Sequence, residues 1–184
     1  MTSRKTAPRE TPPQRLAWPD EIHDLFRSFG VKQVAYVPDG GHAQLIRSVD
    51  ADKSMRAIGL TTEEEGVALA AGAWLGGDRA ALLMQSSGVG NCINMLSLIK
   101  TCKFPLLTLI TMRGEWGEFN SWQVPMASAT PASLRLMDLH VVRADHAGEV
   151  REVVQHAASM AYEGGSAVAV LLSQRLVGAK VFVK

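Results

Sequence analysis

The chain has 184 residues, of which 47% are hydrophobic, 20% charged and 6% aromatic, as expected for a globular domain with a full core. Its 19 Lys and Arg residues nearly balance 18 Asp and Glu residues, for a formal net charge of +1, so the basic excess typical of nucleic-acid-binding proteins is missing. No apolar run approaches the roughly 20 residues that span a bilayer, which argues against a membrane protein.

The first 15 residues are polar and rich in proline, and they lack the apolar core of a secretory signal peptide. We therefore expect a disordered arm over 1–15 and a single domain over 16–184. Cys92 and Cys102 lie in apolar segments without the spacing of metal ligands, so we expect both to be buried thiols of a cytoplasmic protein.

Helical and apolar extended segments alternate along the rest of the chain. Helices are expected at 18–30, 42–50, 61–74, 92–100, 131–138 and 148–165, and strands at 31–37, 55–60, 79–85, 105–112, 139–144 and 166–173. Near-continuous apolar strands between helices predict an α/β fold in three layers, with a parallel sheet of about six strands and helices on both faces.

Three unusual turns and one long irregular segment follow predicted strands. The turns cover 38–42, 61–65 and the glycine-rich loop 86–91, and the segment without a clear period runs over 113–130. Because ligands of parallel sheets bind beyond the carboxyl ends of the strands, we expect these segments to meet in space. The loop 86–91 can present backbone N–H groups to a ligand, although a plain strand-to-helix turn explains it equally well.

Three consecutive glutamates, Glu63, Glu64 and Glu65, run directly into an apolar helix. Carboxylates are favourable in the first turn of a helix, which accounts for one or two exposed acids. The Gly and Ala residues that follow let another element or another subunit approach closely, and such packing would partly desolvate one of the glutamates. A desolvated carboxyl group at this position is a candidate for proton transfer.

Four motifs in order along the chain carry a family resemblance. They are VPDGG (37–41), TEEEGVALAAG (62–72), LLMQSSGVGNCINMLSL (82–98) and MRGEWGEFNSWQVPM (112–126). From about residue 16 onwards, the chain resembles the pyrimidine-binding domain, or alpha subunit, of thiamine-diphosphate-dependent 2-oxo acid decarboxylases of the sulfopyruvate and phosphonopyruvate type.

The resemblance implies a cofactor and the residues that bind it. In this family a glutamate binds ring nitrogen N1′ of the aminopyrimidine and shares a proton with it. Aligning Gly72 with the family's glycine gives this catalytic role to Glu63, and a shift of one residue would give it to Glu64. The residues implied to bind thiamine diphosphate are Pro38, Gly40, Glu63, Ser87, Gly88, Gly90 and Asn91.

The family's Gly-Asp-Gly and later Asn, which hold the diphosphate and Mg²⁺, do not occur in this sequence. The resemblance therefore implies a separate beta subunit that carries them, in an α2β2 assembly or a multiple of it, and no metal ligand in this chain. It implies neither a nucleic-acid partner nor a membrane partner.

On the substrate side, the resemblance implies a small-molecule 2-oxo acid and points to His42, Arg113 and Gln123 as its contacts. Two plainer interpretations stay open, that Arg113 ties down its own loop and that His42 is a solvated residue early in a helix. Relatives carry Asp or Ser where this chain has Gly40. The aromatic residues of the same loop favour either a bulkier substrate or packing against the partner subunit, and they are Trp116, Phe119 and Trp122.

Three other functions remain open for the whole chain. A carboligase or lyase subunit would use the same cofactor for a different reaction. A non-catalytic scaffold subunit would need no carboxyl group at Glu63. A flavodoxin-like nucleotide-binding domain would share the fold class alone.

Overall fold

A computed structural model describes residues 16–178, so the arm expected at 1–15 lies outside the described residues. The described chain is built on a single sheet in which all strands run parallel, in the order β2-β1-β3-β4-β6-β5. The strands are β1 (Val31–Tyr36), β2 (Arg56–Gly59), β3 (Arg79–Gln85), β4 (Leu106–Thr111), β5 (His140–Ala144) and β6 (Ala167–Leu172). This confirms the predicted six-stranded parallel sheet.

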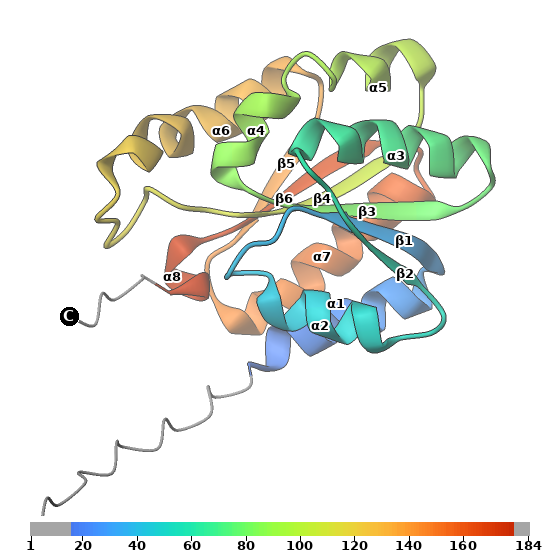
Figure 1. The fold of residues 1–184 in the computed structure, drawn as a ribbon, viewed down its shortest axis with the longest axis horizontal. Coiled ribbons are helices and arrows are strands. Elements are labelled where there is room, and N and C mark those ends of the chain that lie inside the picture. Colours follow the sequence, from blue (N-terminus) through green and yellow to red (C-terminus); the bar gives the residue numbers. More distant parts are fainter. Residues whose placement is uncertain (1–15, 179–184) are drawn as a thin grey trace, which may run out of the picture.

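Helices cover both faces of the sheet, as Figure 1 shows. One face carries α1 (Ala17–Ser28), α2 (Ala43–Ala51) and α7 (Ala147–Tyr162). The other carries α3 (Glu63–Leu75), α4 (Ser86–Cys92), α5 (Ser97–Cys102) and α6 (Val124–Leu136). Two short helical turns, η1 (Ser121–Gln123) and α8 (Gln174–Val177), complete the chain. The three-layer α/β architecture is therefore confirmed.

The burial of the strands follows their place in the sheet. Every residue of β4 and β6 is buried, because these inner strands are covered by helices on both faces. Side chains of alternate residues feed two separate apolar cores, one under α1 and α7 and the other under α3 and α6. Helix α3 lies close to β3, since a Cβ on Gly66 would collide with Leu82.

The glycine-rich segment 86–91, expected to be a loop, is instead most of helix α4. Glycine disfavours helices, so tertiary contacts must outweigh its propensity here. The Ser86 hydroxyl accepts a hydrogen bond from the backbone N–H of Arg113 at 3.0 Å, and the Thr130 hydroxyl donates to the Ser86 carbonyl at 3.4 Å. Both contacts join residues distant in sequence, and periodicity within the segment cannot reveal them.

Three further expectations need correction. The irregular segment 113–130 is irregular only up to residue 120, and α6 begins at Val124 with a proline in its first turn and continues through Pro131. The helix expected at 92–100 is interrupted at 93–96, and α5 begins only at Ser97. Cys92 is buried as expected, but Cys102 is exposed because it lies in the last turn of α5, none of whose residues is buried.

Within residues 16–178, the helices lack the combination of length and apolar character that crossing a bilayer requires.

Candidate functional site

Asp39 joins the carboxyl ends of three neighbouring strands. It follows β1, and its carboxylate accepts hydrogen bonds from the Thr111 hydroxyl at the end of β4 (2.6 Å) and from Gln85 Nε2 at the end of β3 (2.9 Å). The Gly41 N–H adds a third at 3.1 Å. Gln85 in turn accepts a hydrogen bond from the Ser87 hydroxyl at 2.8 Å, which extends the network into the first turn of α4.

Glu63 lies directly on the backbone of α4. It is the first residue of α3 and is only 9% exposed. Asn91 Nδ2 donates a hydrogen bond to its Oε2 at 2.9 Å. A Cβ on Gly88 would collide with the Glu63 carboxyl carbon, so only glycine leaves room for this side chain. The structure thus brings Glu63, Gly88 and Asn91 together, although they come from separate sequence motifs.

The other two glutamates have different surroundings. Glu65 is exposed, and its carboxylate accepts a hydrogen bond from the Thr61 N–H at 2.9 Å, which caps the start of α3. Glu64 is half-buried, and its Oε2 atom has no hydrogen-bond partner among residues 16–178. Burial, together with the charges of Glu63 and Glu64, raises the pKa of the Cys92 thiol to about 12, so this thiol stays neutral.

The first turn places its residues at different depths. Pro38 and Gly40 are exposed, and a Cβ on Gly40 would meet nothing within 4 Å. Gly41 packs against β4, because a Cβ there would lie 2.7 Å from the Thr111 methyl group. Gly90 is exposed in α4, close to the sulfur of Met126.

His42 is fully buried beneath this turn. Its Nε2–H group donates to the Leu109 carbonyl at 3.1 Å, while its Nδ1 finds no hydrogen-bond partner in the described part of the chain. Burial lowers the pKa of His42, although the nearby Asp39 carboxylate and the backbone carbonyls of the strands oppose this effect. The imidazole is therefore neutral and packed inside the domain, which differs from the solvated position considered from the sequence.

The loop after β4 is organised by a buried ion pair. The Arg113 residue is 5% exposed, and its guanidinium donates from Nε to Glu118 Oε2 at 2.9 Å. The Glu118 side chain is 2% exposed and also accepts hydrogen bonds from the Asn120 N–H (3.1 Å) and from Gln174 Nε2 (2.9 Å). Burial alone would raise the pKa of Glu118, but these hydrogen bonds and the Arg113 charge together hold it below its usual value.

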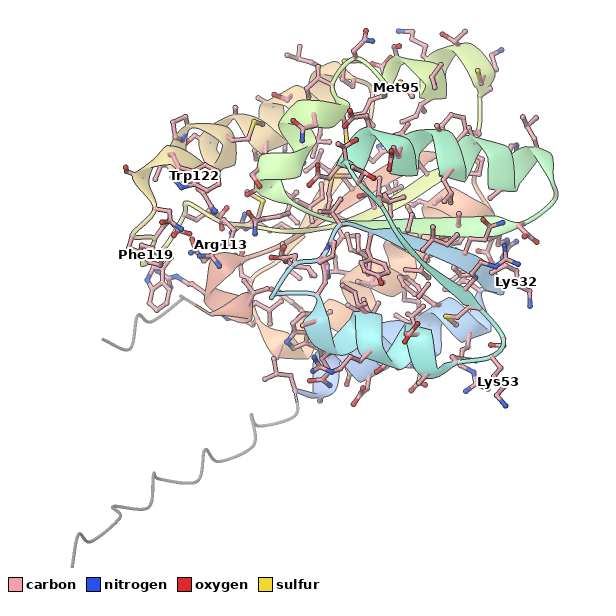
Figure 2. All side chains as sticks on the ribbon, in the orientation of Figure 1. Lys32, Lys53, Met95, Arg113, Phe119 and Trp122 are labelled. Carbon is pink, nitrogen blue, oxygen red and sulfur yellow. The ribbon has the colours of Figure 1, made fainter. Side chains whose placement is uncertain are left out.

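The two ends of this loop pack against each other, at Gly114 and Gln123. Gly114 has a φ of +79°, and a Cβ there would lie 2.6 Å from the backbone carbonyl oxygen of Gln123. Gln123 itself is 6% exposed. The aromatic side chains between these two residues point outward, and Figure 2 shows Phe119 and Trp122 at the outer rim with Arg113 closer to the strands. Trp116, Phe119 and Trp122 are all exposed, and the Arg175 guanidinium lies 5.8 Å from the Trp116 ring centroid.

Unpaired polar atoms are concentrated among the residues that the sequence singled out. In the region 16–178, the buried side-chain nitrogen and oxygen atoms without a hydrogen bond belong to Trp18, His42, Glu64, Arg113 and Gln123. The unpaired atom of Arg113 is Nη2, which lies 2.8 Å from Glu118 Oε2 but lacks hydrogen-bond geometry. Since buried polar atoms are nearly always paired, the unpaired oxygens of Glu64 and Gln123 are candidates to be satisfied by a ligand or another chain.

Sequence reasoning missed the residues that connect the site, above all Asp39, Glu118 and Gln174. Their one signal in the sequence is position, because each polar residue lies two to seven residues after the end of a strand, where ligands of parallel sheets bind. For metal binding, the described residues contain no group of three or more His, Cys, Asp and Glu side chains that could hold an ion.

Comparisons with known proteins identify relatives over most of the chain, although no family model matches it. The alpha subunit of sulfopyruvate decarboxylase from Methanothermobacter thermautotrophicus is 36% identical over 154 residues, which cover 83% of this chain and 93% of the relative. Its counterpart from Methanococcus maripaludis is 35% identical over 154 residues, which cover 83% of this chain and 92% of that relative. Phosphonopyruvate decarboxylase from Streptomyces viridochromogenes is 42% identical over 90 residues, or 48% of this chain and 23% of that enzyme.

Among solved structures, a 2-oxoglutarate:ferredoxin oxidoreductase from Magnetococcus marinus shares the fold. It matches with a TM-score of 0.68 at 14% identity, covering 88% of this chain and 29% of that chain. The identity and the mutual coverage shared with the archaeal alpha subunits are enough to assign a family. The chain therefore belongs to the family of sulfopyruvate decarboxylase alpha subunits.

Proposed function

We propose that this chain is the pyrimidine-binding alpha subunit of a thiamine-diphosphate-dependent 2-oxo acid decarboxylase that works with a separate beta subunit. The observation that carries the proposal is the close packing of the Glu63 side chain against Gly88, together with the hydrogen bond that Asn91 donates to Glu63. A scaffold subunit would need neither this carboxyl group nor the glycine that accommodates it.

The residues present fit the cofactor on the pyrimidine side. Glu63 is mostly withdrawn from water, and Asn91 holds one of its oxygens, so the carboxyl group is oriented before any ligand arrives. It would share a proton with ring nitrogen N1′ of the aminopyrimidine. When bound, thiamine diphosphate supplies the electron sink that makes loss of CO₂ from a 2-oxo acid possible. The residues proposed to surround the pyrimidine are Pro38, Gly40, Ser87, Gly88, Gly90 and Asn91.

On the substrate side, we propose Arg113 and Gln123 as polar contacts of the 2-oxo acid. Both residues are buried at the two ends of the loop after β4, and both side chains carry N–H donors of the kind that bind a carboxylate. Arg113 is already paired with Glu118, so its guanidinium group is oriented before the substrate binds. The proposal leaves His42 out of substrate contact, because its imidazole is fully buried and bonded to Leu109.

The diphosphate and Mg²⁺ are assigned to the beta subunit, in an α2β2 assembly or a multiple of it. The curated relatives that match over most of this chain are named as alpha subunits, which supports the need for a second chain.

The test of this function is a comparison of glutamate variants in the complex with the beta subunit. Glu63→Gln keeps the shape of the side chain but removes its proton-sharing carboxyl group, and we expect turnover to fall about 10²- to 10⁴-fold. Glu65→Gln is the matched control, since Glu65 is exposed and caps only the Thr61 N–H, worth about 0.3–1 kcal/mol to the helix. Proton exchange at C2 of the bound cofactor should slow together with turnover.

Two results would contradict the assignment. If Glu64→Gln slows exchange and Glu63→Gln does not, the cofactor glutamate is Glu64. If neither variant slows exchange, the proposed chemistry does not occur in this protein.

A further inference from the structure

Glu118 is the most heavily hydrogen-bonded acid in the loop 113–123. Its Oε2 atom lies 2.9 Å from Arg113 Nε, 2.8 Å from Arg113 Nη2 and 2.9 Å from Gln174 Nε2. The Gly114 N–H points to the same oxygen at 3.4 Å, and the Asn120 N–H donates to Oε1 at 3.1 Å. This carboxylate therefore gathers donors from the start of its own loop, from Asn120 two residues further on and from Gln174, which begins α8.

The contacts of Glu118 fix the side chain of Arg113 relative to the rest of the site. The backbone N–H of Arg113 is bound to Ser86 Oγ at 3.0 Å, and Ser86 begins the helix on which Glu63 lies. The backbone of Arg113 is thus held by α4, and its side chain is held by Glu118. Because Gly114 packs on the Gln123 backbone, the same arrangement also places Gln123.

A second ion pair, between Glu115 of this loop and Arg143, is accessible to water and serves as a comparison. Glu115 binds Arg143 through both carboxylate oxygens, each at 2.7 Å, but the two side chains are 23% and 35% exposed. Water can replace a partner lost from such a pair, so its removal costs little. Removing the charge of Glu118 would instead leave the Arg113 guanidinium, whose side chain is 6% exposed, without a counter-charge in the interior.

We propose that Glu118 is a positioning residue for the substrate side of the site: its buried carboxylate holds Arg113 and the loop 113–123 in the one arrangement that binds the 2-oxo acid. This inference rests on the proposed function, because it requires Arg113 to contact the substrate. Glu118 itself touches neither cofactor nor substrate and acts through Arg113.

The kinetic test uses the assembled complex and compares Glu118→Gln with Glu115→Gln. Glu118→Gln should raise the KM for the 2-oxo acid about 10-fold or more, while the affinity for thiamine diphosphate changes by less than about threefold. Glu115→Gln should change the same KM by no more than about fivefold, as expected for a half-exposed pair. A loss of structure alone would lower the affinity for the cofactor as well.

A double-mutant cycle shows whether Glu118 acts through Arg113. If it does, the variant carrying both Arg113→Gln and Glu118→Gln should have the kcat/KM of Arg113→Gln alone, within about twofold. If the losses of kcat/KM in the two single variants multiply in the double variant, the proposal is overturned. An unchanged KM in Glu118→Gln would overturn it as well. If Glu118→Gln does not fold, Glu118→Asp takes its place, because it keeps the charge but withdraws it from Arg113 by one methylene group.

Hydrogen exchange supplies a measurement that does not depend on activity. The amides of Gly114 and Asn120 donate to Glu118, so peptides covering 113–123 should exchange faster in Glu118→Gln than in the wild type and in Glu115→Gln. Peptides from α7 serve as the internal reference. An inactive wild-type complex would refute the proposed function, whereas unchanged exchange of 113–123 would refute the positioning role of Glu118 by itself.

Discussion

At the scale of single residues, Gly88 carries a steric requirement that its neighbours do not share. A methyl group on Gly88 would occupy the space of the Glu63 carboxyl group. We expect Gly88→Ala to displace Glu63, to destabilise the chain by about 1–3 kcal/mol and to abolish most turnover of the complex. Thermal unfolding and activity measure the two effects.

Gly148→Ala is the matched control for this substitution. Gly148 lies in the first turn of α7, and a Cβ there would meet nothing within 4 Å. Gly148→Ala should keep turnover and should not lower stability, because alanine is favoured over glycine within a helix. Wild-type activity in Gly88→Ala would mean that Glu63 does not need the position in which the structure places it.

The buried His42 predicts a pH dependence of stability. Its pKa in the folded chain is lowered by burial from the value near 6.5 that an exposed histidine has. Between these two pKa values the unfolded chain binds the additional proton, so the contribution of His42 is fully present above about pH 6.5 and is lost as the pH falls. We expect the unfolding temperature to drop between pH 7.5 and 5.

In His42→Gln the unfolding temperature should depend less on pH between 7.5 and 5, because glutamine does not titrate. Its side-chain amide can still donate to the Leu109 carbonyl. His140 is exposed at the start of β5, so His140→Gln is the control and should keep the wild-type slope. A slope that survives in His42→Gln would show that other groups cause the acid sensitivity.

A site residue is hard to find from the sequence when its partners lie far away along the chain. The apolar helix behind Glu63, Glu64 and Glu65 marks an acid there as unusual, and the family resemblance then selects Glu63. Asp39 and Glu118 look like ordinary loop acids, because contacts such as that of Asp39 with Thr111, 72 residues away, and that of Glu118 with Gln174, 56 residues away, cannot be seen in the local sequence. Hydrogen bonds over such separations leave no periodic signal in the sequence.

At the scale of elements, the strands were predictable and two helices were not. Each strand is a run of apolar residues between turn signals, and no boundary differs from the expected one by more than one residue. Helix α4 contains two glycines and α6 contains Pro131 in its interior, so local propensity argues against both. They form because α4 supports Glu63 and α6 packs on α4 and the sheet, which are tertiary causes.

Helix α3 allows a prediction about its outward face. Gly66, Ala70 and Ala73 pack against the sheet, whereas Ala68 and Gly72 are exposed. A Cβ on Gly72 would meet nothing within 4 Å, so Gly72→Ala should stabilise the isolated chain by about 0.8–1 kcal/mol through helix propensity. If the exposed face packs against the beta subunit, the same methyl group should weaken assembly.

The measurement is the dissociation constant of the two chains, together with the unfolding free energy of this chain alone. Gly148→Ala again serves as control, because α7 lies on the opposite face of the sheet from α3 (Figure 1). Unchanged assembly in Gly72→Ala would place the beta subunit elsewhere.

At the scale of the whole molecule, the site occupies one edge of the sheet. Asp39, Gln85 and Thr111 stand at the carboxyl ends of β1, β3 and β4, and the loop 113–123 extends this edge towards β6 through Gln174. The strand order brings these segments together, as the rule for ligand sites in parallel sheets predicts. Within residues 16–178, buried Oε atoms of Glu64 and Gln123 lack a hydrogen bond, and Glu64 lies next to Glu63 in the first turn of α3 while Gln123 ends the loop that forms this edge.

We expect the purified chain alone, with Mg²⁺ and thiamine diphosphate, to show no decarboxylation of sulfopyruvate or phosphonopyruvate. Activity should appear when the beta subunit is added, and it should saturate at one beta chain for each alpha chain, as an α2β2 unit or a multiple requires. The reason is that the proposed site places the pyrimidine on this chain and the diphosphate with its Mg²⁺ on the other.

Titrating beta into a fixed amount of this chain, with mass measurement by light scattering, gives the stoichiometry and the activity in one experiment. Removing Mg²⁺ with a chelator should abolish turnover of the complex but leave the unfolding temperature of the isolated alpha chain unchanged, because the metal is assigned to the beta subunit. A chelator that destabilises the isolated chain would move the metal to this subunit. Full turnover by the alpha chain alone would show that one chain carries the complete site, and the division of the cofactor between two subunits would have to be abandoned.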